Sequence, residues 1–210
     1  MPKRCAQFRG RSLDLGHGGW AQLIAGFVSD HERVMATLLA SLPLRQEPIT
    51  MFGKTHLTPR LTSWHGDPGC AYRYSGRTFA PQPWTPALAA LRERLRDASG
   101  YAFNCVLANY YRDGGDAMGA HADDEPELGP APDDIGIGSI SLGARRRFLL
   151  RPKAGGETLE FGLGEGDALL MGGTTQAHYK HWVPRTKKPV GPRMNLTFRV
   201  ITRLSSGAEA

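Results

Sequence analysis

The sequence predicts a mainly β protein with flanking helices, in the α+β class, folded as a single domain. Three observations support this expectation: the chain has 210 residues, its two clearest helix patterns lie in its first half, and short apolar runs separated by Gly, Pro and Asp follow from residue 103 onward. A chain of this length suits one full-sized domain better than two. Short strands separated in this way are typical of a sandwich or a barrel. We therefore expect a C-terminal β core that is covered by N-terminal helices.

The N-terminal part combines a glycine-rich segment with a helix. Residues 1–20 contain several glycines and scattered arginines, which predict a flexible arm. A helix follows, because Ser29 and Glu32 have the spacing of a capping box. It must end before Pro43, since proline disfavours helical backbone in the residue that precedes it. Between residues 43 and 83, Pro, Gly and Thr are interspersed with aromatic residues, which favours short strands and turns.

A second helix is predicted after Thr85. This residue is a suitable N-cap, Pro86 suits the first helical position, and Gly100 suits a left-handed stop after the last turn. The apolar face of the helix consists of Leu88, Leu91 and Leu95. The other face is mostly charged, so we expect the helix to pack on a sheet.

The strands of the β core are predicted from runs rich in branched and aromatic residues. These runs are residues 104–111, 137–143, 146–152, 158–164, 167–173 and 193–201. No internal repeat or low-complexity tract interrupts them. We expect residues 21–203 to form the domain and residues 204–210 to form a C-terminal tail.

Composition excludes several classes of protein. Hydrophobic residues make up 40% of the chain and charged residues 22%, which argues against wholesale disorder. No apolar run approaches the roughly 18 residues of a membrane span, and the N-terminus lacks the apolar stretch of a secretory signal. The cysteines Cys5, Cys70 and Cys105 are odd in number and widely spaced, which argues against a disulfide framework or a thiolate zinc site. We therefore expect a cytoplasmic protein that does not bind membranes.

Charge is segregated along the chain. There are 26 basic and 20 acidic residues, for a net charge of +6. Residues 145–153 and residues 180–199 are rich in Lys and Arg and contain no acid, whereas residues 123–134 are acidic. This distribution indicates a polyanionic partner beside an acidic segment with a special chemical role.

The acidic segment begins with a candidate metal site. His121 and Asp123 are two residues apart, so in an extended chain both side chains lie on one face. His178 and His181 follow about sixty residues later. Two histidines and one carboxylate form the facial ligand set of non-haem iron(II) oxygenases. A zinc hydrolase uses similar ligands, so the ligands alone do not identify the metal.

The last strand pattern, RMNLTFR, adds a second chemical feature. Arg193, Asn195, Thr197 and Arg199 alternate with Met194, Leu196 and Phe198, so one face of the strand is polar and the other apolar. If the arginines face the inside of a barrel, they require anionic partners, because unpaired buried charge is costly. A small dicarboxylate bound by guanidinium groups would supply that charge.

These features together resemble the AlkB family of iron(II)- and 2-oxoglutarate-dependent dioxygenases. The motifs that carry the resemblance are NYYRDGGDAMGAHADDEPELG, GSISLGARRRF, GDALLMGGTTQ and HWVPRTKKPVGPRMNLTFR, with MFGK, PRLTSW, YRYSG and FNCVLANYY before them. They are one ordered set that covers roughly residues 50 to 200. The resemblance implies a double-stranded β-helix, or jelly roll, as the core.

The resemblance also implies a cofactor site for Fe(II), with 2-oxoglutarate and O2 as co-substrates. His121, Asp123 and His181 match the iron ligands, and the twelve-residue step from His181 to Arg193 matches the family spacing. His178 is the competing candidate. The positions that match 2-oxoglutarate ligands are Asn109, Tyr111, Arg193, Asn195, Thr197 and Arg199. Of the two arginines, we favour Arg193 for the distal carboxylate.

The substrate positions come from the same resemblance. Residues 50–80 match a nucleotide-recognition segment, and the acids after Asp123 match residues that contact the exocyclic amine of a base. The candidate substrate-binding residues are Phe52, Lys54, Tyr72, Tyr74, Asp124 and Glu125.

The implied activity is oxidative demethylation of N-alkylated bases, such as 1-methyladenine and 3-methylcytosine, in DNA. This would be direct-reversal repair that releases formaldehyde, succinate and CO2. The alternatives are an RNA or tRNA demethylase with the same chemistry and a non-catalytic jelly-roll module that binds nucleic acid. A zinc hydrolase ranks below these, because it does not require the paired arginines. We expect a monomer that acts on single- or double-stranded alkylated DNA.

Overall fold

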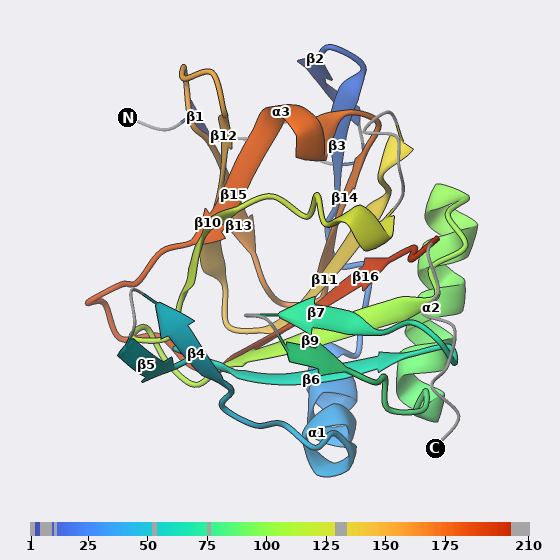
Figure 1. Cartoon of the computed structure of the whole chain (residues 1–210). Coiled ribbons are helices and arrows are strands. Elements are labelled where there is room, and N and C mark those ends of the chain that lie inside the picture. Colours follow the sequence, from blue (N-terminus) through green and yellow to red (C-terminus); the bar gives the residue numbers. More distant parts are fainter. Residues whose placement is uncertain are drawn as a thin grey trace.

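Two facing β-sheets form the body of the protein (Figure 1). The computed structural model describes residues 3–4, 10, 12–51, 54–74, 77–128 and 134–202. The larger sheet contains, in spatial order, β2 (Ser12–Gly16), β3 (Gly19–Ile24), β14 (Asp167–Gly172), β11 (Ile137–Gly143), β16 (Arg193–Arg199), β9 (Cys105–Tyr111) and β6 (Leu61–Gly66). The smaller sheet contains β1 (Lys3–Arg4), β13 (Leu159–Leu163), β12 (Arg146–Pro152), β15 (Tyr179–Val183) and β10 (Met118–His121). All pairs in these sheets are antiparallel except β1 with β13.

The strands β9, β11 and β14 of the larger sheet send alternate side chains to two different cores. In β16, Met194, Leu196 and Phe198 are buried under the helices, whereas Arg193 and its alternating neighbours line a cavity between the sheets. The sequence pattern of this strand predicted that division, and the structure confirms it. Burial of a large apolar side chain contributes about 1.5–3 kcal/mol, so a one-residue slip of the strand is strongly disfavoured.

The outer core lies between the larger sheet and two helices, α1 (His31–Ser41) and α2 (Pro86–Ser99). Figure 1 shows both helices on the side of this sheet that faces away from the smaller one. None of the described helices is long and apolar enough to cross a membrane. The helices thus support the outer face of the larger sheet and leave its inner face to the smaller sheet.

The second helix forms as the sequence predicts. The Thr85 side chain accepts a hydrogen bond from the Leu88 N–H at 3.3 Å, and Pro86 opens the helix. Gly100 ends it with a φ of 78°, a left-handed conformation that favours glycine. The predicted apolar face of three leucines is buried.

The predicted capping box of the first helix is wrong. The helix begins one residue after Asp30, and no side chain caps it. The Asp30 carboxylate instead forms an ion pair with Arg33, one turn into the helix. The end of the helix at Ser41, before Pro43, agrees with the expectation.

The predicted flexible arm is also wrong for residues 12–20. This segment contains β2 and the start of β3, which form a hairpin that pairs with β14 at one edge of the larger sheet. Leu15, Ala21 and Leu23 are buried in the inner core, and this burial holds the hairpin in place. The glycines that suggested flexibility occupy the turn, where Gly16 and Gly18 have positive φ.

Two short hairpins flank β6 in the sequence, as expected for residues 43–83. They are β4 (Pro48–Met51) with β5 (Lys54–Leu57), and β7 (Tyr72–Tyr74) with β8 (Arg77–Phe79). Two of the remaining elements, the short helix α3 (Thr175–His178) and the 3-10 turn η2 (Pro126–Leu128), lie next to the strands that carry the candidate site.

Candidate metal centre and dicarboxylate pocket

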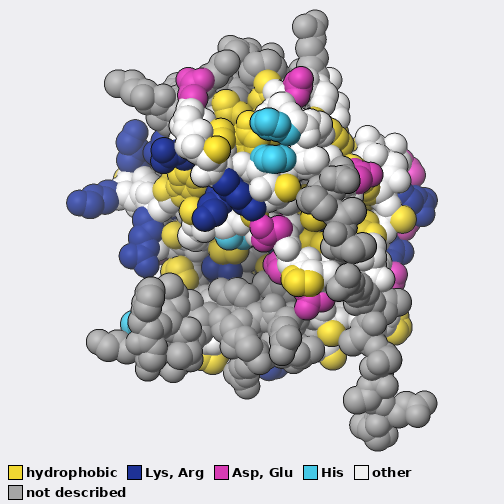
Figure 2. Space-filling view, turned by 45° about the horizontal axis from the view of Figure 1, so that its top comes forward, with side chains coloured by type: hydrophobic (Ala, Val, Ile, Leu, Met, Phe, Trp, Pro, Cys, Tyr) yellow, Lys and Arg dark blue, Asp and Glu magenta, His cyan; other side chains and the backbone are white. Residues whose placement is uncertain are grey.

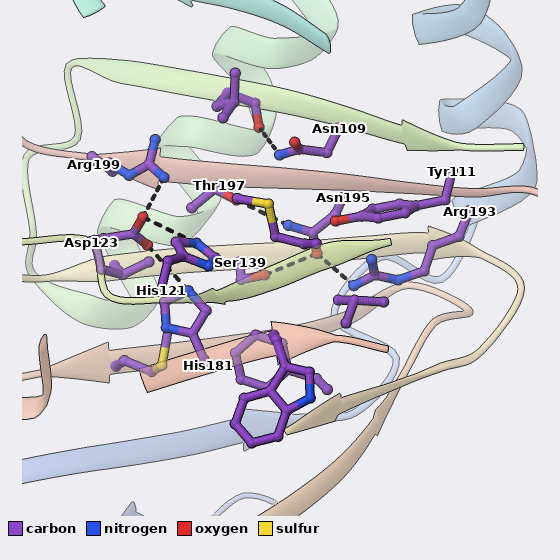
Figure 3. Close-up of a pocket in the computed structure, with 17 residues that line it drawn as sticks. Asn109, Tyr111, His121, Asp123, Ser139, His181, Arg193, Asn195, Thr197 and Arg199 are labelled. Carbon is purple, nitrogen blue, oxygen red and sulfur yellow. Dashed lines mark hydrogen bonds and ion pairs between the residues drawn. The ribbon is translucent and has the colours of Figure 1, made fainter. Parts of the chain in front are cut away.

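The three candidate metal ligands meet between the two sheets. His121 is the last residue of β10, and it lies directly opposite His181 of β15 in the antiparallel ladder. The centroids of the two rings are 4.3 Å apart. Asp123 follows two residues after β10, and one ligand atom from each of the three side chains lies within 4.8 Å of the others. Figure 3 shows the three side chains directed toward one another at one end of the cavity.

Local contacts orient the two imidazole rings. The Nδ1 atom of His121 donates to the Gly119 carbonyl oxygen at 2.9 Å, so Nε2 carries the free lone pair. That Nε2 atom lies 3.8 Å from Oδ1 of Asp123. His181 is buried and stacks on Phe148 at 5.3 Å between ring centroids. Burial lowers the pKa of His181 to about 3, so its imidazole is neutral at neutral pH, as a metal ligand must be.

Asp123 is the most buried of the three candidate ligands. Its side chain is 1% exposed. Burial alone would raise its pKa, but the nearby positive charge of Arg199 holds the pKa well below its usual value, so the group is ionised. Oδ1 accepts a hydrogen bond from Nη2 of Arg199 at 2.6 Å. Oδ2 has no hydrogen-bond partner among the described residues and lies 3.6 Å from Nε2 of His181. A buried anionic oxygen without a donor, beside two imidazole nitrogens, fits a divalent cation.

His178, the competing candidate for the second histidine, lies outside this cluster. It is exposed at the end of α3, and its ring stacks on His17 with 4.7 Å between centroids. The metal-ligand geometry therefore favours His181.

The other end of the cavity is built around Arg193, which is 1% exposed. Its Nη2 atom donates to Oγ of Ser141 and to Oδ1 of Asn195, both at 2.7 Å. Its Nε and Nη1 atoms are buried and have no hydrogen-bond partner among the described residues. Burial lowers the pKa of Arg193 to about 10, so the group still carries its charge at neutral pH. A buried cation with two unsatisfied donors fits the carboxylate of a small ligand.

The remaining residues predicted to bind 2-oxoglutarate line the same cavity. They are Asn109, Tyr111, Asn195, Thr197 and Arg199. Figure 3 shows Tyr111 beside Arg193, and the guanidinium carbon lies 5.2 Å from the ring centroid. The candidate metal ligands and Arg193 thus share one cavity, with polar side chains between them.

The sequence reasoning missed several residues of this site. Ser139 and Ser141 of β11 both donate to Oδ1 of Asn195 at 3.0 Å, and Arg60 donates from Nε to Oδ1 of Asn109 at 2.7 Å. The two serines alternate within the predicted strand 137–143, and that alternation was an available signal of a polar inner face. Arg60 lies in a segment rich in turns, where no periodicity indicates the direction of a side chain.

The two candidate base-contacting acids differ in their surroundings. Asp124 is exposed, and its carboxylate pairs with Lys153 at 2.8 Å. Glu125 is half-buried, its Oε2 atom has no hydrogen-bond partner among the described residues, and burial raises its pKa. Glu125 also lines a second, smaller pocket with Trp64 and Leu128, and Arg199 borders both pockets. The geometry therefore favours Glu125 over Asp124.

The other four substrate candidates cannot be compared in this way. Phe52 lies outside the described residues. The side chains of Lys54, Tyr72 and Tyr74 lie outside the described part as well. Their backbones belong to the hairpins β4–β5 and β7–β8.

The basic run at residues 145–153 has fewer free charges for binding a polyanion than its sequence predicts. Acids from other strands and loops neutralise most of its charges. The pairs are Arg145 with Glu165 and Asp167, Arg147 with Glu160, and Lys153 with Asp124. Within residues 145–199, the exposed cations without an ion pair to a described residue are Arg151, Lys180, Arg185, Lys187 and Lys188. Figure 2 shows several Lys and Arg side chains grouped on the left of one face.

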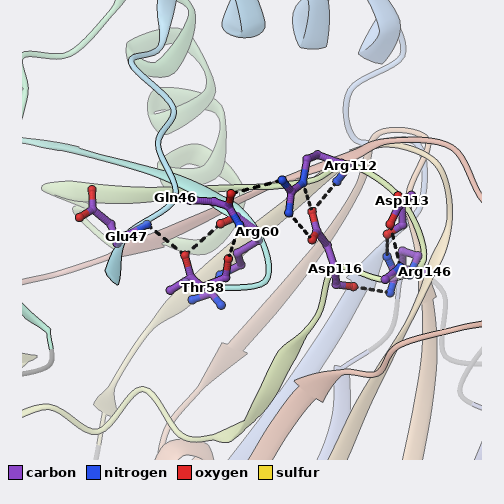
Figure 4. Close-up of polar contacts among 9 residues, drawn as sticks. Gln46, Glu47, Thr58, Arg60, Arg112, Asp113, Asp116 and Arg146 are labelled. Carbon is purple, nitrogen blue, oxygen red and sulfur yellow. Dashed lines mark hydrogen bonds and ion pairs between the residues drawn. The ribbon is translucent and has the colours of Figure 1, made fainter. Parts of the chain in front are cut away.

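Arg146, the buried member of that run, is part of the scaffold. Its guanidinium donates to the carbonyl oxygens of Asp113, Asp116 and Pro184 at 2.8, 2.9 and 2.8 Å (Figure 4). The Asp116 carboxylate accepts two hydrogen bonds at 2.8 Å from the Arg112 guanidinium. These contacts join the turn before β10 to the loop after β15, and so fix the two strands that carry the histidines.

Comparison with known proteins identifies the family. The family model described as the 2OG-Fe(II) oxygenase superfamily matches residues 21–199. The chain is 30% identical over 220 residues to the DNA oxidative demethylase ALKBH2 of Arabidopsis thaliana, a match that covers 91% of this chain and 69% of the relative. The chain belongs to the AlkB family of 2OG-Fe(II) oxygenases. This membership implies Fe(II), 2-oxoglutarate and O2, which the ligand cluster and the buried arginine fit.

Mammalian AlkB relatives are similar over a shorter stretch. The chain is 40% identical over 161 residues to mouse DNA oxidative demethylase ALKBH2, with 73% of this chain and 66% of the relative covered. It is 37% identical over 191 residues to human alpha-ketoglutarate-dependent dioxygenase alkB homolog 3, with 85% and 65% covered. This AlkB chain spans between 57% and 66% of the length of the mammalian relatives it matches.

Solved structures confirm the predicted fold of this AlkB protein. The structure of OsALKBH1 superposes with a TM-score of 0.63 at 18% identity, covering 86% of this chain and 97% of the other. A 2OG-Fe(II) oxygenase family oxidoreductase from Burkholderia pseudomallei gives a TM-score of 0.58 at 17% identity, covering 90% and 89%. The two facing sheets are therefore the jelly-roll core that the sequence predicted.

Proposed function

We propose that this chain is an Fe(II)- and 2-oxoglutarate-dependent dioxygenase that demethylates N-alkylated bases in DNA. The proposed products are the repaired base, formaldehyde, succinate and CO2, and the substrates are 1-methyladenine and 3-methylcytosine. One observation carries the proposal: two histidines and a carboxylate share a cavity with a buried arginine. Two nitrogen atoms of that arginine have no hydrogen-bond partner among the described residues. The ligand cluster alone would indicate only a metal, and the buried arginine alone would indicate only an anion. Together they indicate a metal and a dicarboxylate in one site.

In this proposal the chain holds the metal on one face only. His121, Asp123 and His181 would each supply one ligand atom, which leaves the other coordination positions for small molecules. When bound, Fe(II) together with 2-oxoglutarate and O2 supplies the oxidising chemistry that removes the methyl group. The apolar wall around His181, which includes Phe148 and Val183, limits the entry of water.

The same proposal assigns the two carboxylates of 2-oxoglutarate to different groups. Arg193 would bind the distal carboxylate through Nη1 or Nε, because Nη2 already donates to Ser141 and Asn195. Tyr111 and Asn109 would complete that end of the pocket. The other end of the molecule would then reach the metal.

The methylated base would occupy the pocket next to the metal. A methyl group on the pairing edge is inaccessible inside a duplex, so the nucleotide must leave the base stack. Glu125 would supply an acid that suits a positively charged methylated base. Arg199 lies between this pocket and the metal ligands.

DNA as the polymer is supported by charge and by the named relatives. ALKBH2 of mouse and of Arabidopsis are both named DNA oxidative demethylases. The five exposed cations of residues 145–199 that have no ion pair to a described residue would bind phosphates without regard to sequence. Three of them, Arg185, Lys187 and Lys188, lie in the loop that follows β15.

The test is product release from defined oligonucleotides. The purified chain, supplied with Fe(II), 2-oxoglutarate and O2, is given single- and double-stranded DNA and RNA that carry 1-methyladenine or 3-methylcytosine. We expect formaldehyde and succinate in equal amounts, with the highest rate on DNA. A higher rate on RNA would make the chain an RNA demethylase, and binding without any product would make it a non-catalytic module.

A further inference from the structure

We propose that Gln176 is a positioning residue that sets the place of Asp123 at the metal centre. The inference rests on the metal centre proposed above and concerns a side chain that none of the ligand assignments includes. Gln176 lies in α3, between the strand β14 and the strand that carries His181.

The Gln176 amide is fully buried and directed at Asp123. Its side chain is 0% exposed. Oε1 accepts a hydrogen bond from the backbone N–H of Asp123 at 2.9 Å. Among the described residues, the only hydrogen-bond partner of the amide nitrogen is the sulfur of Met171 at 3.9 Å, and a thioether is a weak acceptor. Because a backbone N–H can only donate, the carbonyl end of the amide must face Asp123, and this contact is the strong hydrogen bond that the amide makes.

Gln176 replaces a strand partner that Asp123 lacks. The strand β10 ends at His121, so the described ladder of the smaller sheet does not reach the Asp123 N–H. A buried N–H without an acceptor costs about 1–3 kcal/mol. The Gln176 carbonyl satisfies this group and thereby fixes the backbone two residues beyond the sheet edge.

Two attachments therefore determine where the Asp123 carboxylate points. The backbone is held by Gln176, and Oδ1 is held by Arg199. With both fixed, the side chain has little freedom to rotate, and Oδ2 stays 3.6 Å from Nε2 of His181. The free oxygen of Asp123 is thus presented to the ligand cluster before any metal binds.

The helix that carries Gln176 is itself anchored. Thr175 is fully buried, and its hydroxyl donates to the Gly172 carbonyl oxygen at 2.7 Å and accepts from the Trp20 N–H at 2.9 Å. The hydrogen bond from Trp20 fixes α3 to β3. The neighbouring Gln176 does not take part in this anchor, and its amide oxygen binds Asp123. The anchor and the positioning contact are separate, so they can be tested separately.

The experiment measures metal binding without any substrate. Mn(II) is titrated into the full chain, and the paramagnetic resonance signal of unbound Mn(II) gives the dissociation constant. The visible spectrum of the Co(II) form reports ligand geometry. The variant Gln176→Met keeps the length of the side chain and removes the acceptor, and Gln176→Glu keeps an oxygen acceptor. Thr175→Val is the matched control, because it removes the anchor of α3 and keeps the contact to Asp123.

We expect Gln176→Met to weaken Mn(II) binding by about 10- to 100-fold, as is typical when a contact behind a metal ligand is lost. Its Co(II) spectrum should change, and Gln176→Glu should restore the spectrum of the parent chain. Thr175→Val should lower thermal stability and keep the parental Mn(II) affinity. If Gln176→Met fails to fold, Gln176→Asn, which is too short to reach Asp123, should show the same loss.

Parental affinity and spectrum in a folded Gln176→Met or Gln176→Asn chain would overturn the positioning role and leave the proposed metal centre intact. Failure of the parent chain to bind Mn(II) would overturn both. Equal loss of affinity in Thr175→Val would also overturn the inference, because it would reduce the effect to general loosening of α3. Absence of demethylation with normal Mn(II) binding would count only against the proposed function.

Discussion

The Nη2 atom of Arg199 lies 2.6 Å from Oδ1 of Asp123, so the carboxylate at the proposed metal centre is also the acceptor of a buried guanidinium. The contact joins β16 to the segment that follows β10, although the two residues are 76 positions apart. Arg199 keeps Asp123 ionised in spite of its burial and leaves Oδ2 to the ligand cluster. One arginine thus connects the strand that lines the dicarboxylate pocket to the metal site.

Replacing Asp123 by Asn should abolish both metal binding and demethylation. Without the metal, the variant should also be less stable by about 1–3 kcal/mol, because the amide is a weaker acceptor for Arg199 than the carboxylate. Urea denaturation of the metal-free chain measures the second effect. Asp97→Asn, in an acid that is 74% exposed on α2, is the control and should change neither property. Full activity in Asp123→Asn would remove Asp123 from the ligand set.

Replacing Arg193 by Lys should raise the apparent KM for 2-oxoglutarate by about 10- to 100-fold, because a charge-assisted hydrogen bond contributes about 1.5–3 kcal/mol. The Mn(II) affinity should not change, since Arg193 contacts no metal ligand in the described structure. Steady-state succinate release against 2-oxoglutarate concentration measures the KM. Arg96→Lys, at an exposed position of α2, serves as the control. An unchanged KM would contradict the dicarboxylate assignment.

The acid that contacts the base should be Glu125 rather than Asp124. Glu125→Gln should raise the KM for a 3-methylcytosine oligonucleotide by about tenfold, since a hydrogen bond to a charged group contributes about 1.5–3 kcal/mol. Asp124→Asn should have little effect, because that carboxylate pairs with Lys153 at the surface. The two neighbouring variants control for each other. The reverse order of effects would transfer the assignment to Asp124.

Exposed cations in the loop after β15 should bind phosphates. The double variant Lys187→Gln with Lys188→Gln should weaken binding to all DNA sequences alike and reduce the salt dependence of binding. The slope of log affinity against log salt should fall by about 0.9 for each duplex phosphate contact that is lost. Arg33→Gln, on α1, is the control and should keep the parental slope. An unchanged slope in the double variant would place the DNA elsewhere.

His65 should make the free energy of unfolding depend on pH. Burial lowers its pKa below the ordinary value of 6.5, while Nδ1 donates to the Pro83 carbonyl and Nε2 accepts from the Ser63 hydroxyl, both at 2.8 Å. Below about pH 6.5 the unfolded chain therefore takes up a proton that the folded chain resists. The free energy of unfolding should be unaffected by this group above that pH and should fall as the pH decreases below it.

The variant His65→Asn tests this pH dependence. It should lose less stability than the parent chain when urea denaturation of the metal-free protein is repeated at pH 7 and at pH 5. An equal loss in both proteins would show that His65 does not resist protonation.

Local signals account for the parts of the fold that the sequence predicts well. The second helix is defined by Thr85, Pro86 and Gly100, and all three act within one turn of a helix end. The alternation in β16 is equally local, and it correctly separates the cavity face from the core face. The failed capping box shows the limit of such signals, because the N-cap position falls on Asp30 rather than Ser29, and the Asp30 carboxylate pairs with Arg33.

Distant pairings account for what the sequence alone does not predict. The hairpin β2–β3 depends on the pairing of β3 with β14, which lies far away in the sequence. Next to this pairing, the Gly26 N–H donates to the Asp167 carboxylate, 141 positions away. In the site, the metal-ligand motif is short and therefore visible, whereas Gln176 contacts Asp123 across 53 positions and Arg60 contacts Asn109 across 49. Such partners have no fixed spacing, so only the folded chain shows them.

The most direct measurement is an anaerobic titration of the chain with Fe(II) in the presence of 2-oxoglutarate, followed by visible absorption. A metal and a keto-acid bound in one cavity produce a charge-transfer band that neither produces alone. We expect the band to saturate at one Fe(II) per chain, to be absent in His181→Ala, and to require far more 2-oxoglutarate in Arg193→Lys. No band in the parent chain, or an undiminished band in His181→Ala, would contradict the shared site.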